Sequence, residues 1–290
     1  MKVIGFTFIR NAIKYDYPIR EAILSILPLC QEVVVAVGNS DDATLELVQQ
    51  LAPGKIRIIQ TQWDETLRQG GQVLAEETNK AFAAVAEDAD WAFYIQGDEV
   101  IHEQYLPAIQ AGMQRWKEDK GVDGLLFNYL HFYGSYDYVG DAYSWYRREI
   151  RIVRPTKRIY SYKDAQGFRK DNNQKLRVKP LDAWVYHYGW VRPPKTMIEK
   201  HRDTRKFYTD DATIAQRWGN KEEFDYGSID SLAPFSGTHP AVMQERIKKI
   251  NWRFDFDPSF NRLRPKDRFR RLVENLTGYR PFEYKNYKIV

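Results

Sequence analysis

The sequence predicts an α/β fold in which a mainly parallel sheet is flanked by helices. Three observations lead to this prediction. Short apolar runs alternate with amphipathic segments of helical length over residues 3–95. The run EVVVAVG at 32–38 is apolar on both faces, as a central parallel strand would be. Strands that alternate with helices of this length form βαβ units with right-handed crossovers.

The first half of the chain is expected to contain four strands and three helices. The strands are expected at 3–9, 32–38, 55–62 and 91–95, and the helices within 16–30, 39–54 and about 72–86. Asp16 can cap the first helix, with Pro18 in its first turn. Ser40 or Asp41 can open the second helix, which closes at a Pro-Gly pair.

The pattern changes after residue 123. Two longer, tyrosine-rich segments at 124–139 and 148–162 predict strands that are antiparallel or lie at a sheet edge. From about Pro193 the chain becomes helical and polar. The sequence therefore predicts an antiparallel element after the parallel part, and then a helical C-terminal extension.

Composition limits the class of protein. The chain has 290 residues, 43% of them hydrophobic, so it can bury a large core, and disorder is excluded. The single cysteine, Cys30, is expected as a packed thiol in an apolar helix and excludes both an intramolecular disulfide and a thiolate metal cluster. No run approaches the roughly 18 apolar residues of a spanning helix, and the N-terminus reads as a strand and not as a signal peptide. We therefore expect a cytoplasmic protein.

The C-terminal part of the chain is basic. The net charge of the whole chain is only +5, but lysine and arginine are concentrated in 246–280, between aromatic residues. Such a segment could face phosphate, a phosphorylated glycan or the anionic inner surface of a membrane. An ordinary solvated helix face gives the same pattern.

The fourth expected strand ends in carboxylates. Its apolar run is followed directly by Gln96, Gly97, Asp98 and Glu99. Ligands of open α/β sheets bind beyond the carboxyl ends of the strands, and carboxylates there are hard ligands for Mg²⁺ or Mn²⁺. A cap on the following helix is the alternative. The chain has no Gly-x-Gly-x-x-Gly motif after its first strand and no Walker motif, which excludes a classical dinucleotide site and a phosphate loop.

The order of these elements resembles the GT-A nucleotide-diphosphosugar transferases, in particular glycosyltransferase family two. The turn GNSDDAT at 38–44 resembles the end of that family's first acidic motif, and QGDE resembles its Asp-x-Asp motif. The resemblance implies a GT-A type fold, a metal ligand at Asp98, and donor contacts from the following residues: Thr7, Ser40, Asp42, Asn79 and Gln96. Val37, Gly38 and Gln96 stand where the family has acidic residues.

A second block resembles the lipopolysaccharide-core glucosyltransferases. REIRIVRPTKRIYSYKDAQGF is followed by AWVYHYGWVRPP, in which His187 and Gly189 match a later His-x-Gly motif. The resemblance implies that His187 is a metal ligand and that Asp164 is the general base. From the residues alone, Asp164 also fits a turn and His187 also fits an aromatic core. Asp141 and Glu149 are rival bases, whereas His131, His201 and His239 show no partner spacing.

The resemblance implies a hexosyltransferase: a metal-dependent inverting glycosyltransferase of cell-surface polysaccharide biosynthesis. Its donor would be a UDP-linked sugar and its acceptor a saccharide or lipid-linked saccharide, with peripheral membrane contact and no nucleic acid. Residues 1–122 would bind the nucleotide sugar, 123–195 would bind the acceptor and hold the base, and 196–290 would form the basic extension. A nucleotidyltransferase is a rival, although the loop after the first strand lacks the Gly- and Arg-rich sequence of that class. A glycan-binding or scaffold protein without catalysis is another.

Overall fold

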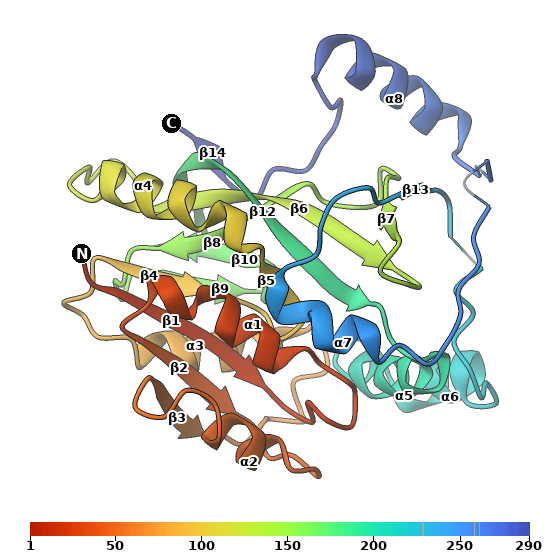
Figure 1. The fold of residues 1–290 in the computed structure, drawn as a ribbon, viewed down its shortest axis with the longest axis horizontal. Coiled ribbons are helices and arrows are strands. Elements are labelled where there is room, and N and C mark those ends of the chain that lie inside the picture. Colours follow the sequence, from red (N-terminus) through yellow and green to blue (C-terminus); the bar gives the residue numbers. More distant parts are fainter. Residues whose placement is uncertain (228, 258, 261) are drawn as a thin grey trace.

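A computed structural model describes residues 1–227, 229–257, 259–260 and 262–290 (Figure 1). Its main sheet contains 11 strands. They are β1 (Val3–Ile9), β2 (Glu32–Val37), β3 (Ile56–Gln60), β4 (Trp91–Tyr94), β5 (Glu99–Ile101), β6 (Gly124–Tyr133), β7 (Tyr138–Gly140), β8 (Arg148–Val153), β12 (Arg177–Trp190), β13 (Leu232–Pro234) and β14 (Lys288–Ile289). A second sheet has three antiparallel strands, β9 (Ile159–Tyr162), β10 (Gly167–Lys170) and β11 (Gln174–Lys175).

The N-terminal half of the main sheet is parallel. β1 lies between β2 and β4 and is parallel to both, and β3 extends the sheet beyond β2. β8 then pairs antiparallel with β4 and with β6. The long β12 runs parallel to β6 and antiparallel to β5. The predicted α/β class, with a mainly parallel sheet and an antiparallel element, is confirmed.

Helices cover both faces of this sheet. The described α-helices are α1 (Ile19–Ile26), α2 (Thr44–Gln49), α3 (Gln72–Ala83), α4 (Leu106–Trp116), α5 (Pro194–Arg205), α6 (Asp211–Trp218), α7 (Gln244–Lys248) and α8 (Pro265–Thr277). Side chains of α1 and α4 pack into the core on one face, and those of α3 pack into the core on the other (Figure 1). This two-sided cover explains why β2 is apolar on both faces.

Three local predictions differ from the structure. α1 has no side-chain cap, because Asp16 has a φ of 50° and pairs with Arg246 instead. α2 begins only at Thr44, after Asp42 has accepted a hydrogen bond from the Thr44 amide. Cys30 lies just beyond a short 3₁₀ turn and not inside a helix, although it is buried as expected, and burial raises the pKa of its thiol.

The C-terminal third is not only helical. It contributes β13, which pairs with β7, and β14, which pairs with β12, so it joins the main sheet at two places. Between these strands α7 lies near α1, while α8 stands at the edge of the molecule (Figure 1). Within the described residues, no helix has the length and apolar character needed to cross a bilayer.

Candidate active site

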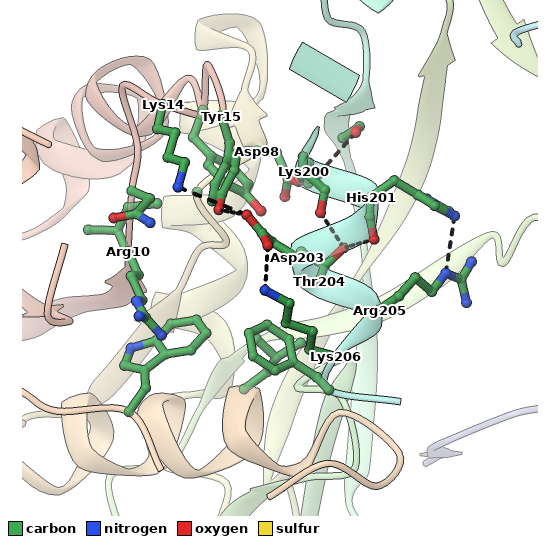
Figure 2. A pocket seen from close by; sticks show the side chains of 18 of the residues that line it. Arg10, Lys14, Tyr15, Asp98, Lys200, His201, Asp203, Thr204, Arg205 and Lys206 are labelled. Carbon is green, nitrogen blue, oxygen red and sulfur yellow. Dashed lines mark hydrogen bonds and ion pairs between the residues drawn. The ribbon is translucent and has the colours of Figure 1, made fainter. Parts of the chain in front are cut away.

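A cavity of about 980 Å³ opens beyond the carboxyl ends of β1 and β4. The loop after β1 forms one wall and α5 forms the wall opposite, with Lys200, Asp203 and Arg205 on the helix (Figure 2). Four of the eight residues predicted as metal ligands, base or donor contacts line it: Gln96, Asp98, Asp164 and His187. They come from segments far apart in the chain, and the fold brings them together where open α/β sheets bind ligands.

The two adjacent carboxylates after β4 point in different directions. Asp98 lines the cavity, whereas Glu99 begins β5 and is fully buried. Arg151 donates to both oxygens of Glu99, at 2.7 and 2.8 Å, and the Tyr129 hydroxyl donates to Oε1 at 2.8 Å. Glu99 thus holds the strand end in place through a buried ion pair, and Asp98 is left to face a ligand. Neither residue caps a helix.

Strand pairing sets Asp98 beside His187. β5 is antiparallel to β12 with Glu99 opposite His187, and the Tyr188 amide donates to the Asp98 carbonyl at 2.8 Å. The Asp98 Oδ1 and His187 Nε2 atoms are therefore only 3.8 Å apart.

Hydrogen bonding fixes which nitrogen of His187 faces Asp98. His131 Nε2 lies 2.7 Å from the Tyr146 carbonyl, which can only accept, so Nε2 carries the proton and Nδ1 of His131 is an acceptor. His187 Nδ1 lies 3.0 Å from that acceptor and must donate to it. Burial lowers the pKa of both imidazoles, so both are neutral and His187 Nε2 presents a lone pair to the cavity.

A divalent cation fits between these two groups. A carboxylate oxygen and an imidazole lone pair face each other with no proton between them, and the other ring nitrogen of His187 is tied back, as in histidines that ligate metals. Gly189 keeps this space open, because a Cβ there would lie 2.4 Å from His187 Nε2 and 3.0 Å from Asp98 Oδ2. The described residues include no cluster of three or more His, Cys, Asp or Glu that could hold a metal, so a cation here would have two protein ligands at most from this part of the chain.

Two cations stand on the other side of Asp98. Lys200 Nζ lies 3.4 Å and Arg192 Nη2 lies 3.8 Å from Asp98 Oδ2. Burial raises the pKa of Asp98, but the neighbouring cations, Lys200 before Arg192, more than offset this and hold it below its ordinary value. Burial, with Arg192, lowers the pKa of Lys200 to about 7. Arg192 is fully buried behind Asp98 and does not line the cavity, and its Nη2 has no hydrogen-bond partner among the described residues.

Among the described residues that line the cavity, Asp164 is the carboxylate without a cationic partner. Among the described residues it accepts no hydrogen bond and forms no ion pair. Each of the other five carboxylates that line the cavity has a cationic partner within 4.0 Å: Asp41 with Lys14, Glu65 with Arg10, Asp98 with Lys200, Asp203 with Lys206, and Asp211 with Arg68. A carboxylate without a partner is free to take a proton from a bound hydroxyl.

The loop that carries Asp164 is held tightly. Its neighbours Lys163 and Ala165 both have positive φ, at 55° and 61°, a conformation that costs energy and is found at functional sites. Gln96 Nε2 donates to the Ala165 carbonyl at 3.1 Å. Gly71 packs against the loop, because a Cβ there would lie 2.7 Å from Asp164 Cβ. Gln96 thus ties the end of β4 to the Asp164 loop.

Neither rival base lies in this cavity. Asp141 pairs with Arg271 in a separate, smaller cavity next to α8. Glu149 is buried and accepts a hydrogen bond from the side-chain Nε2 of Gln166 at 2.7 Å. Burial raises the pKa of Glu149 to about 8.

The raised pKa of Glu149 predicts a pH-dependent stability. The unfolded chain releases this proton near pH 4.3, about the ordinary value, whereas the folded chain holds it to about 8. Folded protein therefore binds more protons between these values, and stability falls as pH rises through them. The melting temperature of Glu149→Gln should therefore fall less than that of the wild type when the pH is raised from about 5 to about 9. Parallel pH profiles of the two proteins would contradict this.

The other predicted donor contacts do not line the cavity. Thr7 is buried in β1. Ser40 accepts from the Asn11 amide at 3.0 Å and Asp42 accepts from the Lys14 amide at 2.7 Å, so both brace the loop after β1. Asn79 exchanges two hydrogen bonds with the backbone of Ser161 and holds β9, the strand that leads to Asp164. Their side chains position the cavity walls.

Trp63 explains one departure from the family pattern. Gly38 stands where the family has an acidic residue, and a Cβ at Gly38 would lie 2.3 Å from Trp63 Nε1. The indole ring therefore occupies the space of the absent side chain. Trp63 lines the cavity between Phe8 and Phe207, with ring centroids 5.8 and 5.5 Å away, and its buried Nε1 has no partner among the described residues. No sequence motif points to this residue.

Comparisons with known proteins find likeness in structure only. No protein-family model and no curated protein matches the sequence. S. aureus TarS is similar at a TM-score of 0.42 and 16% identity, over 77% of this chain and 41% of that chain. Glucosyl-3-phosphoglycerate synthase from Mycobacterium tuberculosis, in complex with Mn²⁺, UDP and phosphoglyceric acid, gives 0.30 and 17%, over 45% and 43%. Galactosyltransferase LgtC, with donor and acceptor sugar analogs, gives 0.28 and 15%, over 44% and 46%.

This chain spans less than half the length of TarS, and identities at this level say nothing of activity. The function is therefore argued from the cavity and its side chains.

Proposed function

We propose that this protein is a metal-dependent inverting glycosyltransferase that takes its sugar from a UDP-linked donor. One observation carries the proposal: a carboxylate and an imidazole that face each other, Asp98 and His187, line the same cavity as a carboxylate without a cationic partner, Asp164. Asp98 and His187 alone would leave a divalent cation with too few ligands. This is the arrangement expected where the oxygens of a bound diphosphate supply the other ligands. Asp164 supplies the base that transfer to a hydroxyl requires.

The residues act on different parts of one displacement. The acceptor oxygen forms its bond to the anomeric carbon while its proton passes to Asp164. The bond from that carbon to the diphosphate oxygen breaks, and its electron pair leaves with the diphosphate. Lys200, which lines the cavity, stabilises the charge that develops there, since it is held in place by Asp98 before the reaction. Attack opposite the leaving group inverts the anomeric centre.

Asp98 Oδ1 and His187 Nε2 would hold Mn²⁺ or Mg²⁺. When bound, the cation would neutralise negative charge on the diphosphate. His131 keeps His187 in the tautomer that this requires, through the 3.0 Å hydrogen bond between their Nδ1 atoms.

We assign the side of the cavity near Trp63 to the donor and the side near Tyr208 to the acceptor. Trp63 lines the cavity beside the loop after β1, and we assign the nucleoside to this side. Tyr208 lies beside Asp164, and burial, with the charge of Asp164, raises its pKa to about 12. We assign the acceptor, a saccharide or lipid-linked saccharide of the lipopolysaccharide-core type, to this side.

The central test is a thermal-shift titration with UDP and Mn²⁺. UDP with Mn²⁺ should raise the melting temperature, because a ligand that binds only the folded state stabilises it. Either component alone should raise it much less, since a cation would have two protein ligands at most from the described part of the chain. Asp98→Asn should abolish the joint effect, whereas Asp211→Asn, at the rim of the same cavity, should keep it. Stabilisation by UDP that persists in EDTA would remove the metal from the proposal.

Gly189→Ala tests the same site without changing a ligand. The added methyl group would lie 2.4 Å from His187 Nε2 and should block the space between the two ligands. We expect the joint effect of UDP and Mn²⁺ to disappear while the circular dichroism spectrum stays that of the wild type. Undiminished binding in this variant would place the cation elsewhere.

Turnover separates the enzyme classes. A glycosyltransferase converts a UDP-sugar to UDP, whereas a nucleotidyltransferase releases pyrophosphate. A glycan-binding protein would bind saccharides without nucleotide and release neither product.

A further inference from the structure

Helix α8 presents its apolar side to solvent. Phe269, Leu272 and Leu276 are spaced along one side of the helix, and they are 66%, 55% and 76% exposed. Figure 1 shows α8 at an edge of the molecule, with its axis outside the layers of the main sheet. No described part of the chain therefore covers these side chains.

The side of α8 that faces the protein is charged. Arg271 pairs with Asp141 of the main domain. Glu274 accepts from Arg147 at 2.6 Å and lies 3.9 Å from Arg280. A surface helix of a globular protein ordinarily buries its apolar stripe and turns its charges to water. α8 has the opposite orientation, fixed by ion pairs, which indicates that its apolar side is covered by something outside this chain.

The apolar surface continues beyond the helix. Tyr279, Phe282 and Tyr284 are exposed as well. Of the twelve exposed large hydrophobic residues in the described chain, eight lie in 269–290. Exposed apolar side chains are thus concentrated in the last part of the chain, in α8 and the residues that follow it.

Unpaired cations border this patch. Arg262, Arg264, Lys266 and Arg268 are exposed, and none forms an ion pair within 4.0 Å with a described residue. On a helical wheel Lys266 and Arg268 flank the stripe of Phe269, Leu272 and Leu276. Residues 262–280 hold seven basic and two acidic side chains. An apolar stripe between lysine and arginine is the pattern of helices that lie in the interface of an anionic bilayer.

We propose that α8 docks this protein on an anionic lipid bilayer, with Phe269, Leu272 and Leu276 entering the acyl boundary and the flanking cations contacting lipid phosphates. The cations favour lipid over a second copy of the chain, because two such patches would repel each other. This inference is independent of the proposed function, since no residue of α8 lines the large cavity.

Vesicle sedimentation with the full chain tests the proposal. The wild type should sediment with vesicles of phosphatidylcholine and phosphatidylglycerol, and much less with phosphatidylcholine alone. Phe269→Ser/Leu272→Ser/Leu276→Ser should weaken binding at least about tenfold, because each buried methylene contributes to interfacial affinity. Lys266→Glu/Arg268→Glu should weaken it by about fivefold or more for each basic charge lost.

The control is Lys248→Glu/Lys249→Glu, which reverses two exposed charges at the end of α7. It should bind vesicles nearly as the wild type does. All variants should keep the wild-type melting temperature, because the altered side chains are exposed. Equal binding to both kinds of vesicle, no binding to either, or an equal loss in the α7 control would overturn the proposal. So would sedimentation velocity that shows a dimer dissolved by the triple serine variant.

Discussion

Asp164→Asn should slow sugar transfer by about 10²- to 10⁴-fold, the usual effect of removing a general base. The amide keeps the size of the side chain but cannot take the acceptor proton. Donor binding should not change, because it depends on Asp98, His187 and the cations near them. The rate can be measured as slow hydrolysis of the UDP-sugar, in which water takes the place of the acceptor, and donor affinity by calorimetry.

Asp203→Asn is the matched control for this prediction. Asp203 lines the same cavity but accepts hydrogen bonds from Tyr15 at 2.5 Å and Lys206 at 2.8 Å, so it is a poor base. Asp141→Asn serves as a second control outside the cavity. If either control abolishes turnover and Asp164→Asn does not, the base is that residue and the role assigned to Asp164 is wrong.

Glu99→Gln should lower the free energy of unfolding by about 3–5 kcal/mol. The substitution leaves the Arg151 guanidinium charged and fully buried with no counter-charge beside it. The Tyr129 hydroxyl and the backbone N–H of Gln96 also lose the carboxylate that accepts their hydrogen bonds. Urea denaturation followed by circular dichroism measures the loss.

Glu65→Gln is the comparison for Glu99→Gln. Glu65 also pairs with an arginine, Arg10, but its side chain is largely exposed, so water screens the pair and its loss should change stability little. Similar small losses in the two variants would show that the Glu99 ion pair does not hold the end of β4 in place.

Much of the framework of this cavity could be predicted from local sequence. An apolar run that stops at QGDE predicts the end of a buried strand, and alternating strands and helices predict that such ends meet at one edge of the sheet. Asp98, His187 and Asp164 do meet at that edge. Helix ends were predicted less well, because Ser40 and Asp16 bind groups that no local pattern indicates.

The cations and the second imidazole of the site could not be predicted. Lys200 lies in a polar helix, and helical spacing does not say which of its many charged residues will face a carboxylate 102 positions away. His131 showed no useful spacing because its partner His187 lies opposite it on a parallel neighbouring strand. That pairing depends on the register of two strands more than fifty residues apart, which is a property of the whole sheet.

The separation of Asp98 from Glu99 has a consequence for how this site tolerates change. The two carboxylates stand on either side of the end of a turn: the Glu99 amide donates to the Gln96 carbonyl at 3.1 Å, so Asp98 lies in the turn and Glu99 is the first residue of β5. The length of this turn therefore decides which acid meets the buried arginine and which one faces the cavity. Exchanging Asp98 and Glu99, or adding one residue to the turn, would damage the protein more than the similarity of the two acids suggests.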